Sequence, residues 1–343
     1  MLTKIHIQNF KGFKDTLIAP LRKVNLILGG QNVGKTSVLE AVYLGASDIG
    51  GFQQIASLFR VAEGGDNKRY VDSVLKGLGS CIELSDGYQN ILRTEFDVAL
   101  SPMNFCELQH LVFNDLRVAR LMKGPDVAEE HIVDAQDFSG DKGSLITAAE
   151  AVGSVSFLNP LVVSVHLPNQ FGLVQLFDQA VLARKKRVLL AMLQRIEPRL
   201  EDMHSLSPDG EQRIYVELKG VGEALPLPQL GHGFSRLVHL YCSLLATNAK
   251  LALMDEIENG IHYSSLPTLF QGIQDIAAQH DVQTLMTTHS WDCIRAAYKT
   301  FADADSLQDF QLIRLERDGD NVRAVVINDE ALDTVMEAGY EVR

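Results

Sequence analysis

The chain has 343 residues, a formal net charge of −13 and 46% apolar residues. This length exceeds one average compact domain, so we expect a core with a large insertion, or two lobes. The acidic surface disfavours nucleic acid as a general ligand, and direct DNA contact would need a local basic patch. The four cysteines lie far apart without zinc spacing, and the sequence has neither a secretion signal nor an apolar run long enough to cross a membrane. We therefore expect a folded cytoplasmic protein with no membrane association.

The first forty residues predict a strand, a phosphate-binding loop and a helix, in that order. Residues 2–7 alternate apolar and polar side chains as a half-buried strand does, and the apolar run 24–28 predicts a central strand. This run leads into a segment that matches G-x-x-x-x-G-K-[ST] at every fixed position, followed by an apolar helix that begins near Ser37. The segment is Gly29-Gly30-Gln31-Asn32-Val33-Gly34-Lys35-Thr36.

Each fixed position of this loop has a chemical reason. Gly29 and Gly34 permit backbone angles that let successive N–H groups point at phosphate oxygens near a helix N-terminus. Lys35 would contact the outer phosphates, and the hydroxyl of Thr36 would bind Mg²⁺. We predict a nucleoside triphosphate and Mg²⁺ as the ligands, with Lys35 also serving catalysis.

Two acids and a histidine complete the predicted site. The apolar run 250–254 ends in Asp255 and Glu256, an arrangement called Walker B, in which Asp255 would hold Mg²⁺ and Glu256 would polarise the attacking water as a general base. The segment 281–288 predicts a further strand, which places His289 at the edge where open α/β sheets gather ligands. His289 is therefore predicted to contact the γ-phosphate.

These segments carry a family resemblance. Residues 255–264 and 287–290 resemble the ABC-type ATPases of the RecF, SMC and OLD kind, and in particular their small stand-alone members, described as AAA-family ATP-binding proteins. The opening 7–13 and the closing 341–343 are similar to that group as well. The resemblance implies an α/β P-loop NTPase fold with a mixed central sheet, an N-terminal antiparallel β subdomain and a large inserted lobe.

The resemblance also implies sites shared between two subunits. In such proteins a signature segment of one subunit caps the nucleotide that the other holds, and the matching segment here is Gly231-His232-Gly233 at a predicted helix start. Relatives often carry a serine in this segment, which this chain lacks, but helix N-terminal N–H groups attract phosphate without it. Gln170 is the best-placed candidate for a further metal ligand. His262 stands where transporter ATPases carry Asp, which argues against a transport subunit.

The remaining sequence predicts organisation rather than chemistry. We expect residues 1–45 and 156–343 to form the ATPase core, the latter with a helical subdomain, and residues 46–155 to form an inserted lobe that is α/β or helical. Residues 171–200 predict a helix whose basic run 184–187 is either a solvated face or a phosphate contact. A hairpin is expected over 310–327 and a short helix from Glu330. Nothing in the sequence resembles a TOPRIM nuclease.

Taken with these motifs, the resemblance implies an ATP-hydrolysing switch that dimerises, or assembles further, around ATP. By resemblance it would gate a separately encoded effector, a nuclease or toxin, in DNA processing, DNA repair or antiviral (anti-phage) defence. The alternative is a nucleotide-gated scaffold or inhibitor with negligible turnover, which the missing signature serine motivates. A GTPase is disfavoured because no Asn-Lys-x-Asp segment occurs.

Overall fold

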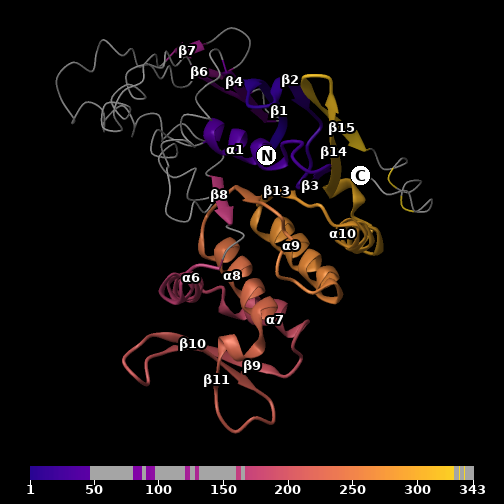
Figure 1. Cartoon of the computed structure of the whole chain (residues 1–343). Helices are drawn as coiled ribbons and strands as arrows, with labels where there is room; N and C mark the ends of the chain where they lie inside the picture. The colour runs from indigo at the N-terminus through magenta and orange to yellow at the C-terminus, as the bar shows by residue number, and fades with distance from the viewer. Residues whose placement is uncertain are drawn as a thin grey trace, which may run out of the picture.

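The computed structural model describes residues 1–46, 80–86, 90–96, 120–123, 128–130, 160–163 and 167–327, together with residues 332 and 336. Within this part, the chain builds a six-stranded central sheet, a six-stranded N-terminal sheet and a three-stranded sheet that lies beyond the helices (Figure 1). No helix of the described residues is long and apolar enough to cross a membrane.

The central sheet is mixed, as predicted, and has the order β15-β14-β3-β13-β12-β8. All neighbours pair in parallel except β14 and β15, which form the predicted hairpin at one edge. The run Val24–Gly29 becomes β3 near the middle, and its almost continuous burial is typical of a parallel strand covered on both faces. The other strands are β8 (Pro160–Val163), β12 (Leu251–Met254), β13 (Gln283–Thr287), β14 (Phe310–Asp318) and β15 (Asn321–Ile327).

The N-terminal sheet is antiparallel and has the order β2-β1-β4-β5-β6-β7. Helix α1 (Lys35–Ala46) lies between this sheet and the central sheet, and almost all of its residues are buried (Figure 1). A helix that is apolar on all sides requires such cover. The strands are β1 (Leu2–Phe10), β2 (Phe13–Ile18), β4 (Ser80–Asp86), β5 (Asn90–Phe96), β6 (Arg120–Lys123) and β7 (Ala128–Glu130).

Strand pairing places part of the predicted inserted lobe in this N-terminal sheet. Strand β4 pairs with β1, from Leu2 opposite Asp86 to Gln8 opposite Cys81, and β5 continues the sheet from β4. Segments 80–86 and 90–96 therefore extend the sheet that begins at residue 2, because the edge of β1 away from β2 needs a partner for its backbone groups. Most of the remaining residues of 46–155 lie outside the described part.

The other face of the central sheet is covered by helices. Alternate residues of β3 and β12 point to two separate apolar clusters, one with α1 and the N-terminal sheet and one with the helices that follow. The helices of the second cluster are α6 (Gln170–Leu182), α7 (Lys186–Gln194), α8 (His232–Ala246), α9 (Leu266–His280) and α10 (Trp291–Asp303). Short 3₁₀ turns cover Leu227–Leu230 (η2), Tyr263–Ser265 (η3) and Leu307–Asp309 (η4).

The single helix predicted over 171–200 is wrong. The chain forms two helices, α6 and α7, because Arg184 adopts a left-handed φ of 60° and the turn around it closes back on α6. The basic run therefore lies at a helix junction rather than on one helical turn. Lys186 pairs with Asp202 at 2.7 Å, and the Lys185 ammonium lies 3.3 Å from the His280 ring, so this part of the run contacts protein groups.

The three-stranded sheet carries the chain from α7 back to α8. Its order is β11-β10-β9, and both pairs are antiparallel. It lies at the far end of the helices from the N-terminal sheet (Figure 1). The strands are β9 (Leu200–Leu206), β10 (Arg213–Leu218) and β11 (Leu225–Pro226). Most of the helix predicted from Glu330, and the closing residues 341–343, lie outside the described part.

Candidate functional site

The phosphate-binding loop joins β3 to α1 at the C-terminal edge of the central sheet. Gly29 has a φ of +151°, and a Cβ there would lie 2.7 Å from the Leu315 carbonyl oxygen. Gly34 has a φ of +108°, and a Cβ there would lie 3.0 Å from the ring of Phe13. Both positions therefore require glycine for conformation and for space. The space at both glycines is limited because strands β14 and β2 pack directly on this loop.

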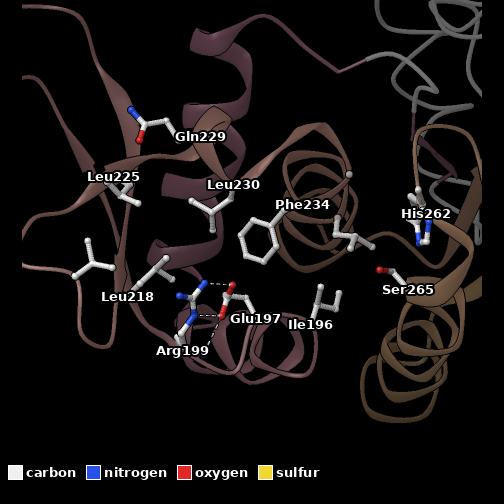
Figure 2. A pocket seen from close by; sticks show the side chains of 14 residues that line it. Ile196, Glu197, Arg199, Leu218, Leu225, Gln229, Leu230, Phe234, His262 and Ser265 are labelled. Carbon is white, nitrogen blue, oxygen red and sulfur yellow. Dashed lines mark hydrogen bonds and ion pairs between the residues drawn. The ribbon is translucent and has the colours of Figure 1, made fainter.

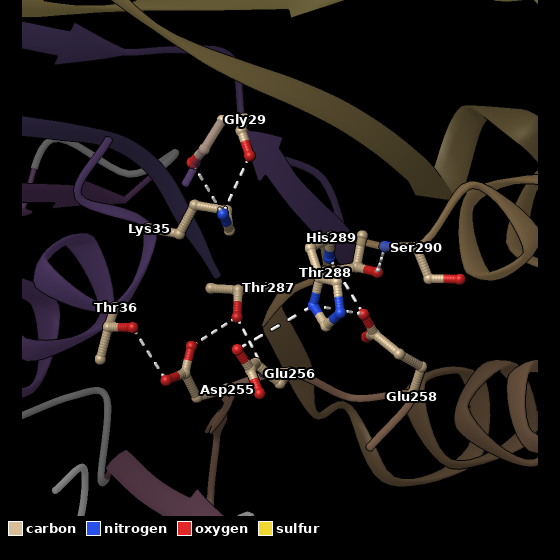
Figure 3. Close-up of polar contacts among 11 residues, drawn as sticks. Gly29, Lys35, Thr36, Asp255, Glu256, Glu258, Thr287, Thr288, His289 and Ser290 are labelled. Carbon is tan, nitrogen blue, oxygen red and sulfur yellow. Dashed lines mark hydrogen bonds and ion pairs between the residues drawn. The ribbon is translucent and has the colours of Figure 1, made fainter. Parts of the chain in front are cut away.

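Lys35 folds back over its own loop. Its ammonium donates to the carbonyl oxygens of Gly29 at 2.9 Å and Gly30 at 3.1 Å (Figure 3). Burial lowers the pKa of Lys35, while the nearby acids Asp255 and Glu256 oppose that shift. The charged end of Lys35 is thus held at the loop by two neutral acceptors, which an anionic ligand would outcompete electrostatically.

Thr36 and Asp255 lie in direct contact although 219 positions separate them in sequence. The Thr36 hydroxyl donates to Asp255 Oδ2 at 2.8 Å (Figure 3). A hydroxyl beside a carboxylate is an oxygen donor set that suits Mg²⁺, an ion that takes few protein ligands and keeps several waters. No cluster of three or more His, Cys, Asp or Glu side chains suited to a metal ion occurs among the described residues. Thr36 and Asp255 are the pair that fits this ion.

Glu256 and His289 lie on the same edge of the sheet, as predicted. The Glu256 carboxylate is about half exposed, at 47%, and lies 3.9 Å from His289 Nδ1. Its backbone has a left-handed φ of 43°, which is uncommon for a residue with a side chain and typical of functional turns. The exposed carboxylate is free to contact a water or a ligand at this edge.

Sequence reasoning missed Glu258 and Thr287. Glu258 Oε1 accepts from the His289 backbone N–H at 3.0 Å and lies 3.1 Å from its Nδ1 (Figure 3). The hydroxyl of Thr287 contacts Asp255 and the Glu256 backbone. Only their positions in the sequence could have indicated them. Glu258 lies in the same turn as the two acids, and Thr287 ends the strand next to that turn.

The predicted signature segment forms a helix start, packed against the turn that follows Walker B. Gly231 caps α8 with a φ of 92°, and Gly233 approaches so closely that a Cβ there would lie 3.2 Å from the Gly260 carbonyl oxygen. The ring of His232 packs closely on Gly260, so that a Cβ at Gly260 would lie 3.1 Å from this ring. The contacts described for residues 231–233 are with η2 and this turn, and none is with residues 29–37 of the same chain.

A cavity of about 550 Å³ lies behind this helix start (Figure 2). Phe234 and Leu237 of α8 form one wall, and Ile261 and His262 of the turn after Walker B form another. On the side of the small sheet, Arg199 pairs with Glu197 through two hydrogen bonds of 2.9 and 3.0 Å. The signature segment and the turn after Walker B therefore both border this cavity.

Gln170 begins α6 and contacts the helical side of the molecule. Its side chain donates to the Gln212 carbonyl oxygen at 3.1 Å, and it lines a second cavity together with His232 and Ser235. The structure thus brings Gln170 together with the signature segment, and its described contacts do not include Thr36 or Asp255. Its role as a metal ligand stays a prediction.

Solved structures share this fold. The SMC head bound to the C-winged helix domain of ScpA gives a TM-score of 0.57 at 12% identity, over 98% of this chain and 99% of that one. The SMC head domain from Thermotoga maritima gives a TM-score of 0.52 at 12% identity, over 95% of this chain and 99% of that one. These likenesses establish the α/β fold with its mixed central sheet and separate antiparallel sheets.

Two sequence relatives extend the comparison. A Helicobacter pylori protein named ATP/GTP phosphatase is 22% identical to this chain over a match that covers 93% of each chain. An uncharacterized protein of Methanocaldococcus jannaschii is 37% identical over 60 residues, which are 18% of this chain and 27% of that one.

The family model described as "AAA ATPase domain" matches residues 1–68 and 175–294. The matched segments contain the phosphate-binding loop, the signature segment, both Walker B acids and His289, and the interval between them falls mostly in the predicted insertion. The chain therefore belongs to the AAA ATPase domain family.

Proposed function

We propose that this ATPase is a switch in which two copies close around ATP and open after hydrolysis. Lys35 and the loop N–H groups would hold the phosphates, and Thr36 with Asp255 would hold Mg²⁺, which neutralises phosphate charge when bound. Glu256 would take the proton of the attacking water, and His289 would contact the γ-phosphate. The observation that carries this assignment is the convergence of Lys35, Thr36, Asp255, Glu256 and His289 at one edge of the sheet (Figure 3).

The need for a second copy follows from the place of the signature segment. The first N–H groups of α8 have no partner within the helix, as at any helix start, and they favour a phosphate. Their described neighbours in the same chain are η2 and the turn at Gly260, not the phosphate-binding loop. The helix start at Gly231–Gly233 would therefore meet the nucleotide bound by a partner copy.

The nucleotide and the downstream partner are inferred from likeness. The name of the Helicobacter pylori relative, ATP/GTP phosphatase, supports hydrolysis of a nucleoside triphosphate, and we propose ATP as the substrate. The SMC head is described in complex with ScpA, which supports a partner protein in general. We propose that this chain gates a separate effector in DNA processing or anti-phage defence.

A mixing experiment tests the shared site. Lys35→Ala removes the phosphate-binding lysine, and His232→Glu puts a negative charge on the exposed start of α8, where a partner's phosphate would lie. Each variant alone should lose ATP turnover. An equal mixture should recover about a quarter of wild-type turnover, because half of the dimers are mixed and each of these contains one intact site.

The neutral variant His232→Gln is the matched control and should retain turnover alone. No recovery in the mixture, with both variants folded, would show that each chain hydrolyses ATP without a partner's signature segment. Full activity of His232→Glu alone would contradict the contact between this helix start and phosphate. Multiple turnover that is lost in Glu256→Gln would exclude the scaffold alternative.

A further inference from the structure

Thr287 ends β13 between the two strands that carry the motifs, with β3 on one side and β12 on the other. Its hydroxyl donates to Asp255 Oδ1 at 2.5 Å and accepts from the Glu256 backbone N–H at 2.8 Å (Figure 3). A hydroxyl has one proton to donate, so this proton is fully used on Asp255. One side chain thus contacts both Walker B acids.

The backbone around Thr287 strengthens this connection. The Ile257 N–H donates to the Thr287 carbonyl oxygen at 3.1 Å, and the Thr288 N–H donates to the Ile27 carbonyl oxygen of β3 at 3.0 Å. The turn of the two acids is therefore tied to β13, and β13 is tied to the strand that enters the phosphate-binding loop. Glu256, which has a left-handed φ, lies in this turn, and its backbone N–H donates to the Thr287 hydroxyl.

The two oxygens of Asp255 accept from two different threonines. Thr36 donates to Oδ2 and Thr287 donates to Oδ1. Thr36 has a second task, because its hydroxyl oxygen would also bind Mg²⁺ through a lone pair in the working site. Thr287 has no such second task, and its bond can persist with and without the ion.

We propose that Thr287 is a positioning residue for ATP hydrolysis, which orients the Asp255 carboxylate toward Mg²⁺ and fixes the backbone of Glu256. The proposal rests on the roles of Asp255 and Glu256 given under the proposed function. Outer partners of metal-binding side chains act in this way, because they fix the orientation and ionised form of the ligand.

Thr287→Val tests the proposal because it keeps the shape and removes both hydrogen bonds. Turnover should fall about 10- to 100-fold, and the Mg²⁺ concentration for half-maximal activity should rise severalfold. Thr287→Ser retains the hydroxyl and should stay within about threefold of the wild type in both quantities. The dependence on Mg²⁺ is the readout that a purely structural role would not change.

Thr284→Val is the matched control on the same strand. Thr284 is fully buried, and its hydroxyl has no hydrogen-bond partner among the described residues. This variant should retain wild-type turnover and Mg²⁺ dependence. Thermal unfolding of all variants checks folding, and Thr287→Cys, which keeps the size and weakens both bonds, replaces Thr287→Val if the valine variant does not fold.

The variant Asp255→Asn distinguishes a failure of the proposed function from a failure of the proposed role of Thr287. If Asp255→Asn retains turnover, the assignment of the metal site is wrong and the proposed function fails with it. If Asp255→Asn is inactive but Thr287→Val matches the wild type in turnover and Mg²⁺ dependence, only the role of Thr287 is overturned. A serine variant as impaired as the valine variant would also overturn it.

Discussion

The two glutamates in the turn after β12 have different surroundings. Glu256 is 47% exposed, whereas Glu258 is 10% exposed and holds the backbone and ring of His289. A general base must reach a water, while a residue that orients a histidine must be packed. The exposure of the two side chains therefore supports Glu256, rather than Glu258, in the proposed base role.

The loop glycines give a residue-scale prediction. Gly34→Ala should destabilise the fold by about 1–3 kcal/mol, because a side chain is strained at a positive φ and its Cβ would press on Phe13. Gly30→Ala is the matched control, since a Cβ at Gly30 has nothing within 4 Å. Denaturant unfolding of both variants measures the difference. Equal stability of the two variants would contradict the described loop conformation.

The predictability of single residues depends on how local their signal is. Lys35, Thr36, Asp255 and Glu256 are predictable because the chemistry of their motifs requires fixed spacing along the chain. Thr287 is not, because its role depends on the alignment of β13 with β12, which brings positions 32 apart into contact. A threonine at a strand end has many ordinary explanations in sequence alone.

At the scale of elements, α8 buries polar and charged residues along with apolar ones. Arg236 and His239 are almost fully buried, one turn apart, and the Arg236 guanidinium lies 3.3 Å from His239 Nδ1. Burial lowers the pKa of Arg236 to about 10, and burial with the neighbouring Arg236 lowers the pKa of His239 to about 4. His239 is therefore neutral in the folded protein near pH 7.

This histidine predicts a pH dependence of stability. The folded pKa of His239 lies below the ordinary value of 6.5, so the unfolded chain binds the proton first as the pH falls. Its contribution to stability is complete above pH 6.5 and is lost progressively toward pH 4, at up to about 1.4 kcal/mol per pH unit.

Urea unfolding at several pH values measures this loss. His239→Asn, which keeps an acceptor near Arg236 but does not titrate, should show a shallower decline of unfolding free energy between pH 6.5 and 4. Identical slopes for the wild type and the variant would show that folding does not lower the pKa of His239.

Element predictions fail where tertiary contacts decide. The central strands and the hairpin 310–327 follow their sequence patterns, but the predicted helix over 171–200 breaks at Arg184. The apolar positions of 171–200 continue through the break, since both α6 and α7 pack on α8 and belong to one cluster. Periodicity therefore reports the buried face and not the junction.

At the scale of the whole molecule, the two segments that we propose to contact nucleotide lie on separate parts of one chain. The phosphate-binding loop lies between the two large sheets, whereas the start of α8 lies toward the small sheet at the other end of the helices (Figure 1). The fold resembles an SMC head over nearly its whole length. In the proposed dimer, one chain's loop would therefore meet the other chain's helix start.

The most direct test is the mass in solution of Glu256→Gln, with Mg-ATP and without nucleotide. Loss of the proposed base should stop hydrolysis and trap the closed pair, so we predict that the mass doubles on addition of Mg-ATP. Lys35→Ala in the same background should abolish the change, because the phosphates are no longer held. An unchanged mass with ATP demonstrably bound would contradict the proposal that ATP joins two copies.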